Sequence, residues 1–224
     1  MKRWHYIVLL VVVVVGIVYV YLHWQELGLG GSHGFGSSGA LSADQALSSS
    51  RPAIINWQKV DRTPDGFKVD MPSDVKEIQI PAYNEIGGTD QVNMIFSYPN
   101  SETSFSVAWA DDPPVVRVNN RVPDRILDMA RDDALTRTQT TLVSESRITP
   151  GGFPARDFAA RNVDGGVINS RLISAGSRLY MLIAAFPSAN ARRDQDVTRF
   201  FNSFTTTASA SIPETMPAAP APIR

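Results

Sequence analysis

A nearly unbroken apolar run near the N-terminus, from Tyr6 to Trp24, limits how this chain can fold. At about 1.5 Å per residue, a helix over this run spans roughly 28 Å, close to the ~30 Å hydrocarbon core of a bilayer. Trp and Tyr side chains gather toward both ends of the run, where aromatic rings favour the headgroup level. The run also lacks the polar face of a helix that packs on a soluble core. We therefore expect one transmembrane helix over residues 6–24.

The distribution of charge predicts the orientation of this anchor. Lys2 and Arg3 precede the run, and the next basic residue is Arg51. The positive-inside rule then places residues 1–5 in the cytoplasm and the rest of the chain outside, as a single-pass protein of the cytoplasmic membrane. A protein secreted after signal cleavage is the alternative. The apolar run is longer than the core of a usual signal peptide, and its better cleavage site, Ser38-Gly39-Ala40, lies far beyond it.

The rest of the chain divides into three parts by composition. Residues 25–53 are rich in Gly and Ser, which predicts a flexible linker with a root-mean-square reach of about 30 Å. Residues 208–224 are rich in Pro and Ala, which predicts a disordered tail. Residues 54–207 carry the periodic apolar pattern, so we expect one globular domain there.

Short alternating runs in this domain predict strands, and two longer runs predict helices. Pro123 suits the first position of a helix, and Val197, Phe200, Phe201 and Phe204 give a second helix over residues 191–202 an apolar face, with Ser188 or Asn190 as its cap. Leu179–Phe186 is apolar on both faces, as in a central strand. The expected strands are 57–60, 67–71, 75–80 (stopped by Pro81), 93–98, 104–110, 142–148, 153–162, 167–174 and 178–186. The fold class is α+β, an antiparallel sheet with helices packed on it.

Several of these segments together carry a resemblance to a known group. They are Trp57 with Asp65–Val69 and Pro72, the helical segment Leu127–Asp132, Gly152–Arg156, Arg178–Leu182 and Phe200–Phe204. The pattern resembles bacterial secreted or membrane-anchored proteins of unknown function, which are similar to the PsbP-like α/β/α sandwich group. The resemblance implies an accessory protein that binds partners, and it supplies no catalytic residue.

The residue types in the domain restrict its chemistry. The chain has no cysteine, and its histidines, His5, His23 and His33, all precede the domain. The domain therefore lacks the usual general base, thiol nucleophile and zinc ligands. A formal net charge of -1 gives no reason to expect nucleic acid as a partner. We expect no cofactor, and we assign no catalytic residue.

Two pairs of charged residues are candidate ligand contacts. Arg156 and Arg171 lie on expected neighbouring strands, where a shared face would bind an anionic group, although cross-strand pairing with Asp157, Asp164 or other neighbours is the favoured explanation. Asp111 and Asp112 offer carboxylate oxygens to a hard cation, although no calcium-binding loop surrounds them and solvation accounts for such a pair.

These observations predict a membrane-tethered, extracytoplasmic binding or accessory module of the cell envelope. Its expected contacts are the membrane, through the N-terminal helix, and a protein partner in the envelope. The alternative is a carboxylate-dependent envelope hydrolase, which needs two acids that converge in a cleft.

Overall fold

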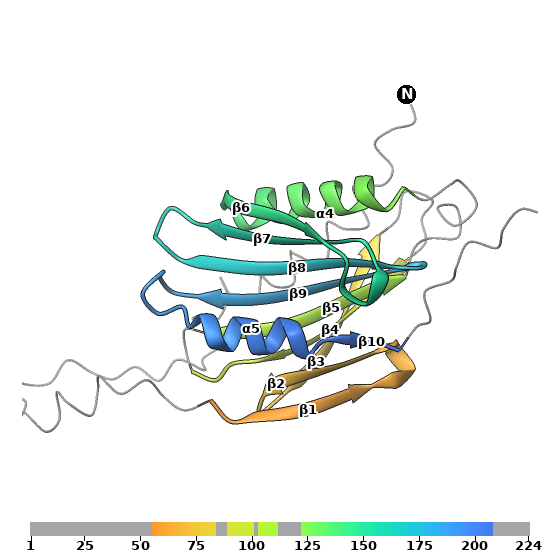
Figure 1. Cartoon of the computed structure of the whole chain (residues 1–224), viewed down its shortest axis with the longest axis horizontal. Coiled ribbons are helices and arrows are strands. Elements are labelled where there is room, and N and C mark those ends of the chain that lie inside the picture. The colour runs from red at the N-terminus through yellow and green to blue at the C-terminus, as the bar shows by residue number, and fades with distance from the viewer. Residues whose placement is uncertain (1–54, 84–88, 101–102, 112–121, 208–224) are drawn as a thin grey trace, which may run out of the picture.

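The computed structural model describes residues 55–83, 89–100, 103–111 and 122–207 (Figure 1). The expected anchor, linker and tail, together with Asp112, lie outside these described residues. None of the helices within the described ranges has the length and apolar character needed to cross a membrane.

Ten strands, two α-helices and two short 3-10 turns make up the described part. The strands are β1 (Trp57–Arg62), β2 (Phe67–Pro72), β3 (Lys76–Tyr83), β4 (Thr89–Ser97), β5 (Ser104–Asp111), β6 (Thr141–Ile148), β7 (Ala155–Arg161), β8 (Val167–Ala175), β9 (Arg178–Phe186) and β10 (Thr205–Thr206). The helices are α4 (Pro123–Thr138) and α5 (Asp194–Ser203), and the turns are η1 (Thr63–Asp65) and η2 (Pro150–Gly152). The predicted α+β class is confirmed.

Seven strands form one antiparallel sheet with the order β3-β4-β5-β9-β8-β7-β6. It consists of two meanders, β3 to β5 and β6 to β9, which join where β5 pairs with β9. Strand β9 occupies the middle of the sheet, and most of its residues are buried. This position explains why Leu179–Phe186 is apolar on both faces, because such a strand is covered on each side.

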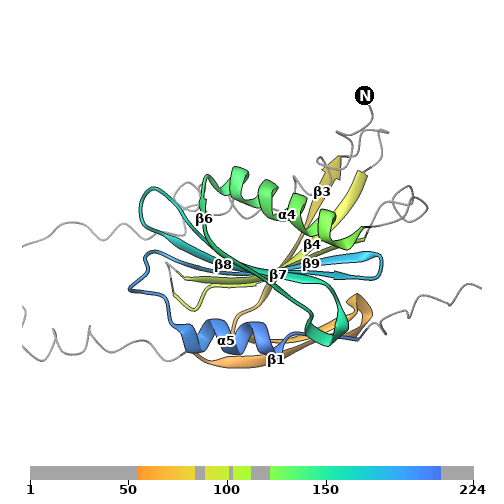
Figure 2. The same ribbon diagram turned by 45° about the horizontal axis from the view of Figure 1, so that its top comes forward.

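The sheet separates two apolar cores (Figure 2). On one face, α4 buries Leu127, Ala130 and Ala134 against β4, β5, β7, β8 and β9. On the other face lie α5 and a small sheet with the order β1-β2-β10. The result is a sandwich in which both faces of the sheet contribute to a core.

The core beneath α5 is built from aromatic rings. Phe67 stacks on Phe204 with ring centroids 5.4 Å apart and meets Trp109 edge-on at 5.1 Å. Phe105 meets Phe200 edge-on at 5.3 Å. The predicted apolar face of α5 is confirmed, since Val197, Phe200, Phe201 and Phe204 are all buried in this core.

Several predicted boundaries differ from the observed ones by a few residues, and two of the differences have a clear physical reason. Pro81 lies inside β3 rather than stopping it, because β3 is an edge strand where a missing N–H breaks no bond to a further strand. Helix α5 begins at Asp194, and its N-cap is Arg193 without a side-chain cap. Ser188 instead accepts a hydrogen bond at its Oγ from the Ala191 N–H, within the preceding turn.

Asp61, in the hairpin formed by β1 and β2, has a lowered pKa that can be measured. Lys68 Nζ lies 2.7 Å from Asp61 Oδ2, and the Thr63 hydroxyl and N–H both donate to Asp61 Oδ1. These contacts, Lys68 first, lower the pKa of Asp61 from 3.8 to about 2. Because the folded value is the lower one, the contribution of Asp61 to stability is complete above pH 3.8 and is lost as the pH falls through about 2.

We expect an NMR titration to place the pKa of Asp61 near 2 and to show it rising toward 3.8 in Lys68→Gln. Lys76→Gln, an exposed lysine on β3, is the control and should leave the pKa of Asp61 unchanged. An ordinary pKa for Asp61 in the unaltered chain contradicts the contacts described.

Candidate functional site

Arg156 and Arg171 do not share a face of the sheet. In the β7–β8 register, Arg156 lies opposite Leu172, and Asp157 lies opposite Arg171. Because successive side chains of a strand point to opposite faces, Arg156 projects toward α4 and Arg171 toward α5. The predicted shared face is therefore wrong, and one anion does not reach both guanidinium groups from the same side.

Arg156 is enclosed on the α4 side of the sheet, where 1% of the residue is exposed. Its Nη2 donates to Asp124 Oδ1 at 2.7 Å and to Asp128 Oδ1 at 3.2 Å, and its Nε lies 3.3 Å from Glu145 Oε1. The hydrogen bond from Arg156 holds the pKa of Asp124 below its ordinary value. Arg156 thus joins β7 to α4 and β6.

Arg171 is bound to the protein through all three of its nitrogen atoms. Its Nε and Nη2 donate to the two carboxylate oxygens of Asp157, each at 2.7 Å, and Nη1 donates to the Phe201 carbonyl at 2.9 Å. The guanidinium also lies 5.0 Å from the centre of the Phe201 ring. The pairing with Asp157 considered from the sequence is the arrangement observed.

Asp111 forms a fork-shaped ion pair with Arg178 across β5 and β9. The two Asp111 oxygens accept from Arg178 Nε at 2.6 Å and Nη2 at 2.9 Å. Within the described ranges, no group of three or more His, Cys, Asp or Glu side chains is placed to hold a metal ion. The cation that neutralises Asp111 is therefore Arg178 of the protein itself.

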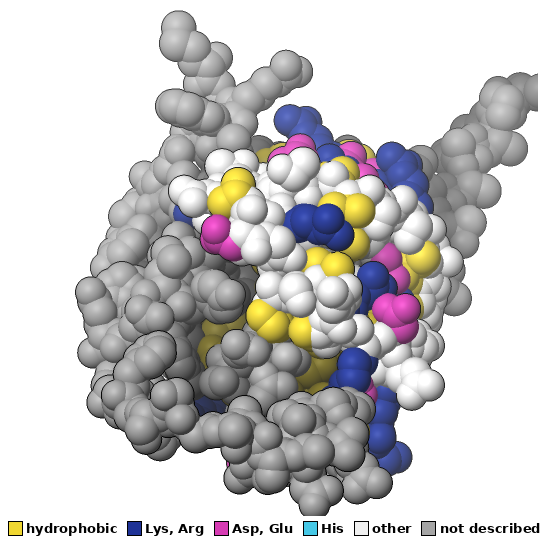
Figure 3. Space-filling view, turned by 90° about the vertical axis from the view of Figure 1, so that its left-hand side faces the viewer, with side chains coloured by type: hydrophobic (Ala, Val, Ile, Leu, Met, Phe, Trp, Pro, Cys, Tyr) yellow, Lys and Arg dark blue, Asp and Glu magenta, His cyan; other side chains and the backbone are white. Residues whose placement is uncertain are grey.

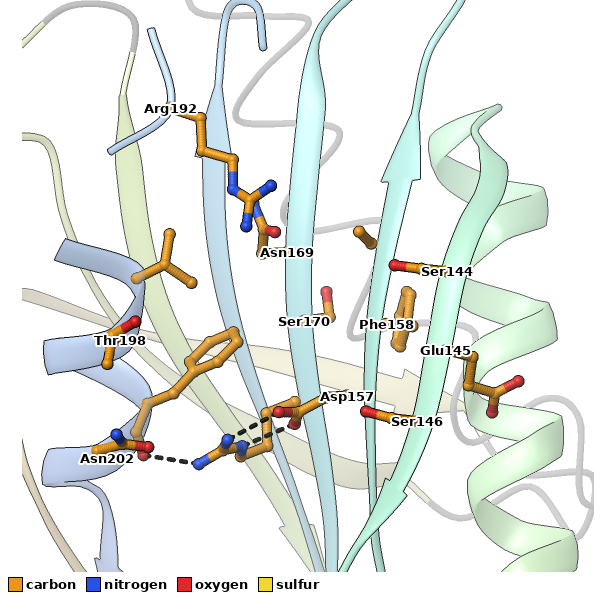
Figure 4. Close-up of a pocket in the computed structure, with 14 residues that line it drawn as sticks. Ser144, Glu145, Ser146, Asp157, Phe158, Asn169, Ser170, Arg192, Thr198 and Asn202 are labelled. Carbon is orange, nitrogen blue, oxygen red and sulfur yellow. Dashed lines mark hydrogen bonds and ion pairs between the residues drawn. The ribbon is translucent and has the colours of Figure 1, made fainter. Parts of the chain in front are cut away.

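A groove of about 440 Å³ lies between α5 and the strands β6, β7 and β8 (Figure 4). The register explains why this part of the sheet is hollow. Ser144, Ala159, Asn169 and Ala184 lie side by side across β6, β7, β8 and β9, and none of them is large. Helix α5 lies over the middle of the sheet (Figure 1), and Ser144, Ala159 and Asn169 line the groove beside it. The volume is within the range of sites that hold small molecules.

The floor of the groove carries an unpaired hydrogen-bond donor. Asn169 is 5% exposed, and its Nδ2 has no hydrogen-bond partner in the protein. Its neighbours in the register, Ala159 and Ala184, have no polar side-chain atom to offer. Buried amides are almost always hydrogen-bonded, so an unpaired one is a specific feature of this site.

The wall and one end of the groove come from α5 and the segment before it. Val197, Thr198, Phe201 and Asn202 line the wall, and Arg192 stands at the end. Figure 4 shows the Arg192 guanidinium pointing toward Asn169. Arg192 pairs with Asp194 at 2.9 Å, but 80% of the Asp194 side chain is exposed, so the pair is open to solvent.

The acids around the groove do not converge. Asp157 lies on the α5 face and is held by Arg171. Glu145 is paired with Phe158 in the register and projects to the α4 face, where it contacts Arg131 at 2.6 Å. Figure 3 looks onto the left-hand end of the molecule in Figure 1 and shows basic and acidic side chains interspersed there. The groove is therefore a polar site with one cation at its end.

The sequence pattern does not predict this groove. The one local signal is Asn169, a polar residue inside a strand where Val167 and Ile173 on the same face are apolar. Ser144, Ser146 and Thr198 look like ordinary surface residues in the sequence, and only the strand order and the position of α5 bring them together.

No family model matches the sequence, and no curated protein matches it. Among solved structures, cyanobacterial PsbP from Synechocystis sp. PCC 6803 is similar with a TM-score of 0.47 and 12% identity, over 77% of this chain and 98% of that chain. A protein of unknown function from Pseudomonas aeruginosa has a TM-score of 0.31 and 13% identity, over 60% of this chain and 85% of that chain. The first of these belongs to the group that the sequence pattern resembles.

Proposed function

We propose that this protein is a non-catalytic binding module that a membrane anchor holds on the outer side of the cytoplasmic membrane. The observation that carries the proposal is the groove beside α5, which offers hydrogen-bonding groups without a converging pair of carboxylates. Asn169, Ser144 and Ser146 provide neutral polar groups, and Arg192 provides a charge at one end. Such a set of groups recognises a ligand by hydrogen bonds and shape.

The geometry of the acids weighs against a carboxylate-dependent hydrolase. Such an enzyme needs two carboxyl groups on opposite sides of one scissile bond. Asp157 and Glu145 both touch the groove, but their side chains leave the sheet on opposite faces. Each is also engaged by arginine, Asp157 by Arg171 and Glu145 by Arg131. Neither acid has the freedom that a general acid or nucleophile requires.

The proposed location rests on the sequence before the domain. Lys2 and Arg3 precede the apolar run 6–24, and the Gly- and Ser-rich linker 25–53 follows it. A flexible tether of this length has a root-mean-square reach of about 30 Å, so it holds the domain near the bilayer and raises its local concentration for partners at the membrane. The proposed partner is therefore another component of the cell envelope.

One experiment on the full-length chain tests both parts of the proposal. A photo-crosslinking residue replaces Thr198, which is exposed on the wall of the groove, and the chain is irradiated in intact spheroplasts. We expect adducts at this position, and we expect protease added outside to remove them together with the domain.

The same residue placed at Arg125, exposed on α4, is the matched control and should give no adduct. Protection of the domain from external protease in intact spheroplasts contradicts the proposed location. Equal adducts at the two positions, or none at Thr198, contradict the proposed role of the groove.

A further inference from the structure

The groove beside α5 presents two hydrogen-bond donors at one end, the buried Asn169 amide and the Arg192 guanidinium. Asn169 Nδ2 is buried and has no partner, and the Arg192 guanidinium points toward it (Figure 4). Leaving a buried donor unpaired costs free energy, which a bound acceptor returns. The arrangement therefore favours a ligand with an electron-rich oxygen at this point.

We propose that this groove binds small ligands that carry a carboxylate, with one carboxylate oxygen accepting from Asn169 Nδ2 and the other from Arg192. This inference rests on the proposed function and names the ligand class of the same site. The Arg192–Asp194 pair does not prevent it, because 38% of the Arg192 side chain and 80% of the Asp194 side chain are exposed. Such surface pairs contribute little, so the guanidinium exchanges Asp194 for a ligand carboxylate at small cost.

The charges on the groove face select a carboxylate over a phosphate dianion. Arg171, the other cation that lines the groove, is already neutralised by both oxygens of Asp157. One guanidinium charge then remains, and it matches the single charge of a carboxylate. A phosphate dianion would bring a second negative charge into the groove with no cation left to compensate it.

The remaining lining determines what else the ligand carries. Ser144 and Ser146 place hydroxyl groups along β6, and Ala159, Val197 and Phe201 supply apolar surface. This mixture suits a carboxylate attached to amide or hydroxyl groups and small apolar groups. The end of a short peptide and an acidic sugar both have this chemistry, and the carboxylate is the group they share.

The test measures binding to the full-length chain in detergent by calorimetry. The peptide probes are acetyl-Ala-Ala and its C-terminal amide, the sugar probes are glucuronate and glucose, and inorganic phosphate is the third anion. We expect at least one carboxylate probe to bind at least about tenfold more tightly than its neutral counterpart, because charge-assisted hydrogen bonds are about twice as strong as neutral ones. Whichever of the two carboxylates binds identifies the source.

Three variants separate a binding role from a structural one. Arg192→Gln and Asn169→Leu should each weaken carboxylate binding about tenfold or more, whereas Arg125→Gln on α4 removes the same charge and should leave binding unchanged. Asn169→Leu should also keep or raise the melting midpoint without ligand, because it removes a buried unpaired donor.

Several outcomes overturn the inference. They are equal binding of charged and neutral probes, phosphate binding as tight as the better carboxylate, no binding of any probe, or unchanged binding in Arg192→Gln. Carboxylate binding by Arg192→Gln tests the inference even if Asn169→Leu fails to fold. If adducts at Thr198 persist while no carboxylate binds, the proposed function stands and this ligand class fails.

Discussion

Replacing Phe200 by alanine should lower the free energy of unfolding by about 3–5 kcal/mol, because a lost transfer term and a new cavity add. Phe200 is fully buried in α5, where its ring meets that of Phe105 at 5.3 Å. The net stability of a domain of this size is only about 5–15 kcal/mol, so this variant should lose a large share of it. Urea unfolding of residues 54–207, followed by circular dichroism, measures the difference.

Gln195→Ala is the matched control for this variant. Gln195 lies in the same helix but is exposed, so we expect its replacement to change the free energy of unfolding by less than about 0.5 kcal/mol. Arg193 would be a poorer control, because its Nε contacts Asp196 Oδ2 at 2.6 Å. Equal midpoints for Phe200→Ala and Gln195→Ala would show that α5 does not pack on the sheet as described.

Local periodicity was sufficient to predict most of the elements. The apolar positions of α5 recur at helical spacing, and Leu179–Phe186 is apolar without alternation because β9 is covered on both faces. Such patterns depend only on which face of an element is buried, so they are visible before the fold is known. The error at Pro81 shows the limit of this reasoning, since a proline stops a central strand but not an edge strand, and sheet order is not a local property.

The face on which Arg171 lies depends on register, which local pattern does not determine. Arg171 pairs with Asp157 rather than with Arg156, and a shift of one residue would exchange the two faces. The length of the turn between β7 and β8 determines whether Arg171 falls on the same face of the sheet as Arg156. Residues 162–166 contain Asn, Asp and two Gly, which suit turns of several lengths, so the sequence leaves the register open.

The groove was beyond prediction for a related reason. Its floor needs the neighbouring strands β6, β7 and β8, and its wall needs α5, which lies far away in the sequence. The hollow arises where Ser144, Ala159 and Asn169 fall into one row across the sheet. Ser144 and Ala159 carry no signal in the sequence, and only the strand pairing places them beside Asn169 in the floor of the groove.

The second large effect concerns Arg156, whose buried guanidinium joins three elements. Arg156→Ala removes the hydrogen bonds to Asp124 and Asp128 and the contact with Glu145, together with the packing of the aliphatic stem. Breaking a fully buried ion pair costs about 3–5 kcal/mol. Here the side chains of the acidic partners are between 23% and 55% exposed, so water partly replaces the arginine when it is removed. We therefore expect a loss of about 2–3 kcal/mol in the free energy of unfolding.

Two further variants separate packing from charge at this position. Arg156→Met keeps most of the buried stem and lets the acids rehydrate, so we expect it to cost about 1 kcal/mol. Arg147→Ala is the control, because Arg147 faces the same Asp124 at 3.7 Å but is 70% exposed, and its loss should cost less than about 0.5 kcal/mol. Urea unfolding measures all three, and an NMR titration of Arg156→Ala should show the pKa of Asp124 rising toward its ordinary value. Equal losses in Arg156→Ala and Arg147→Ala would mean that the buried guanidinium contributes no more than a surface charge, and that α4 is held to the sheet by its apolar face alone.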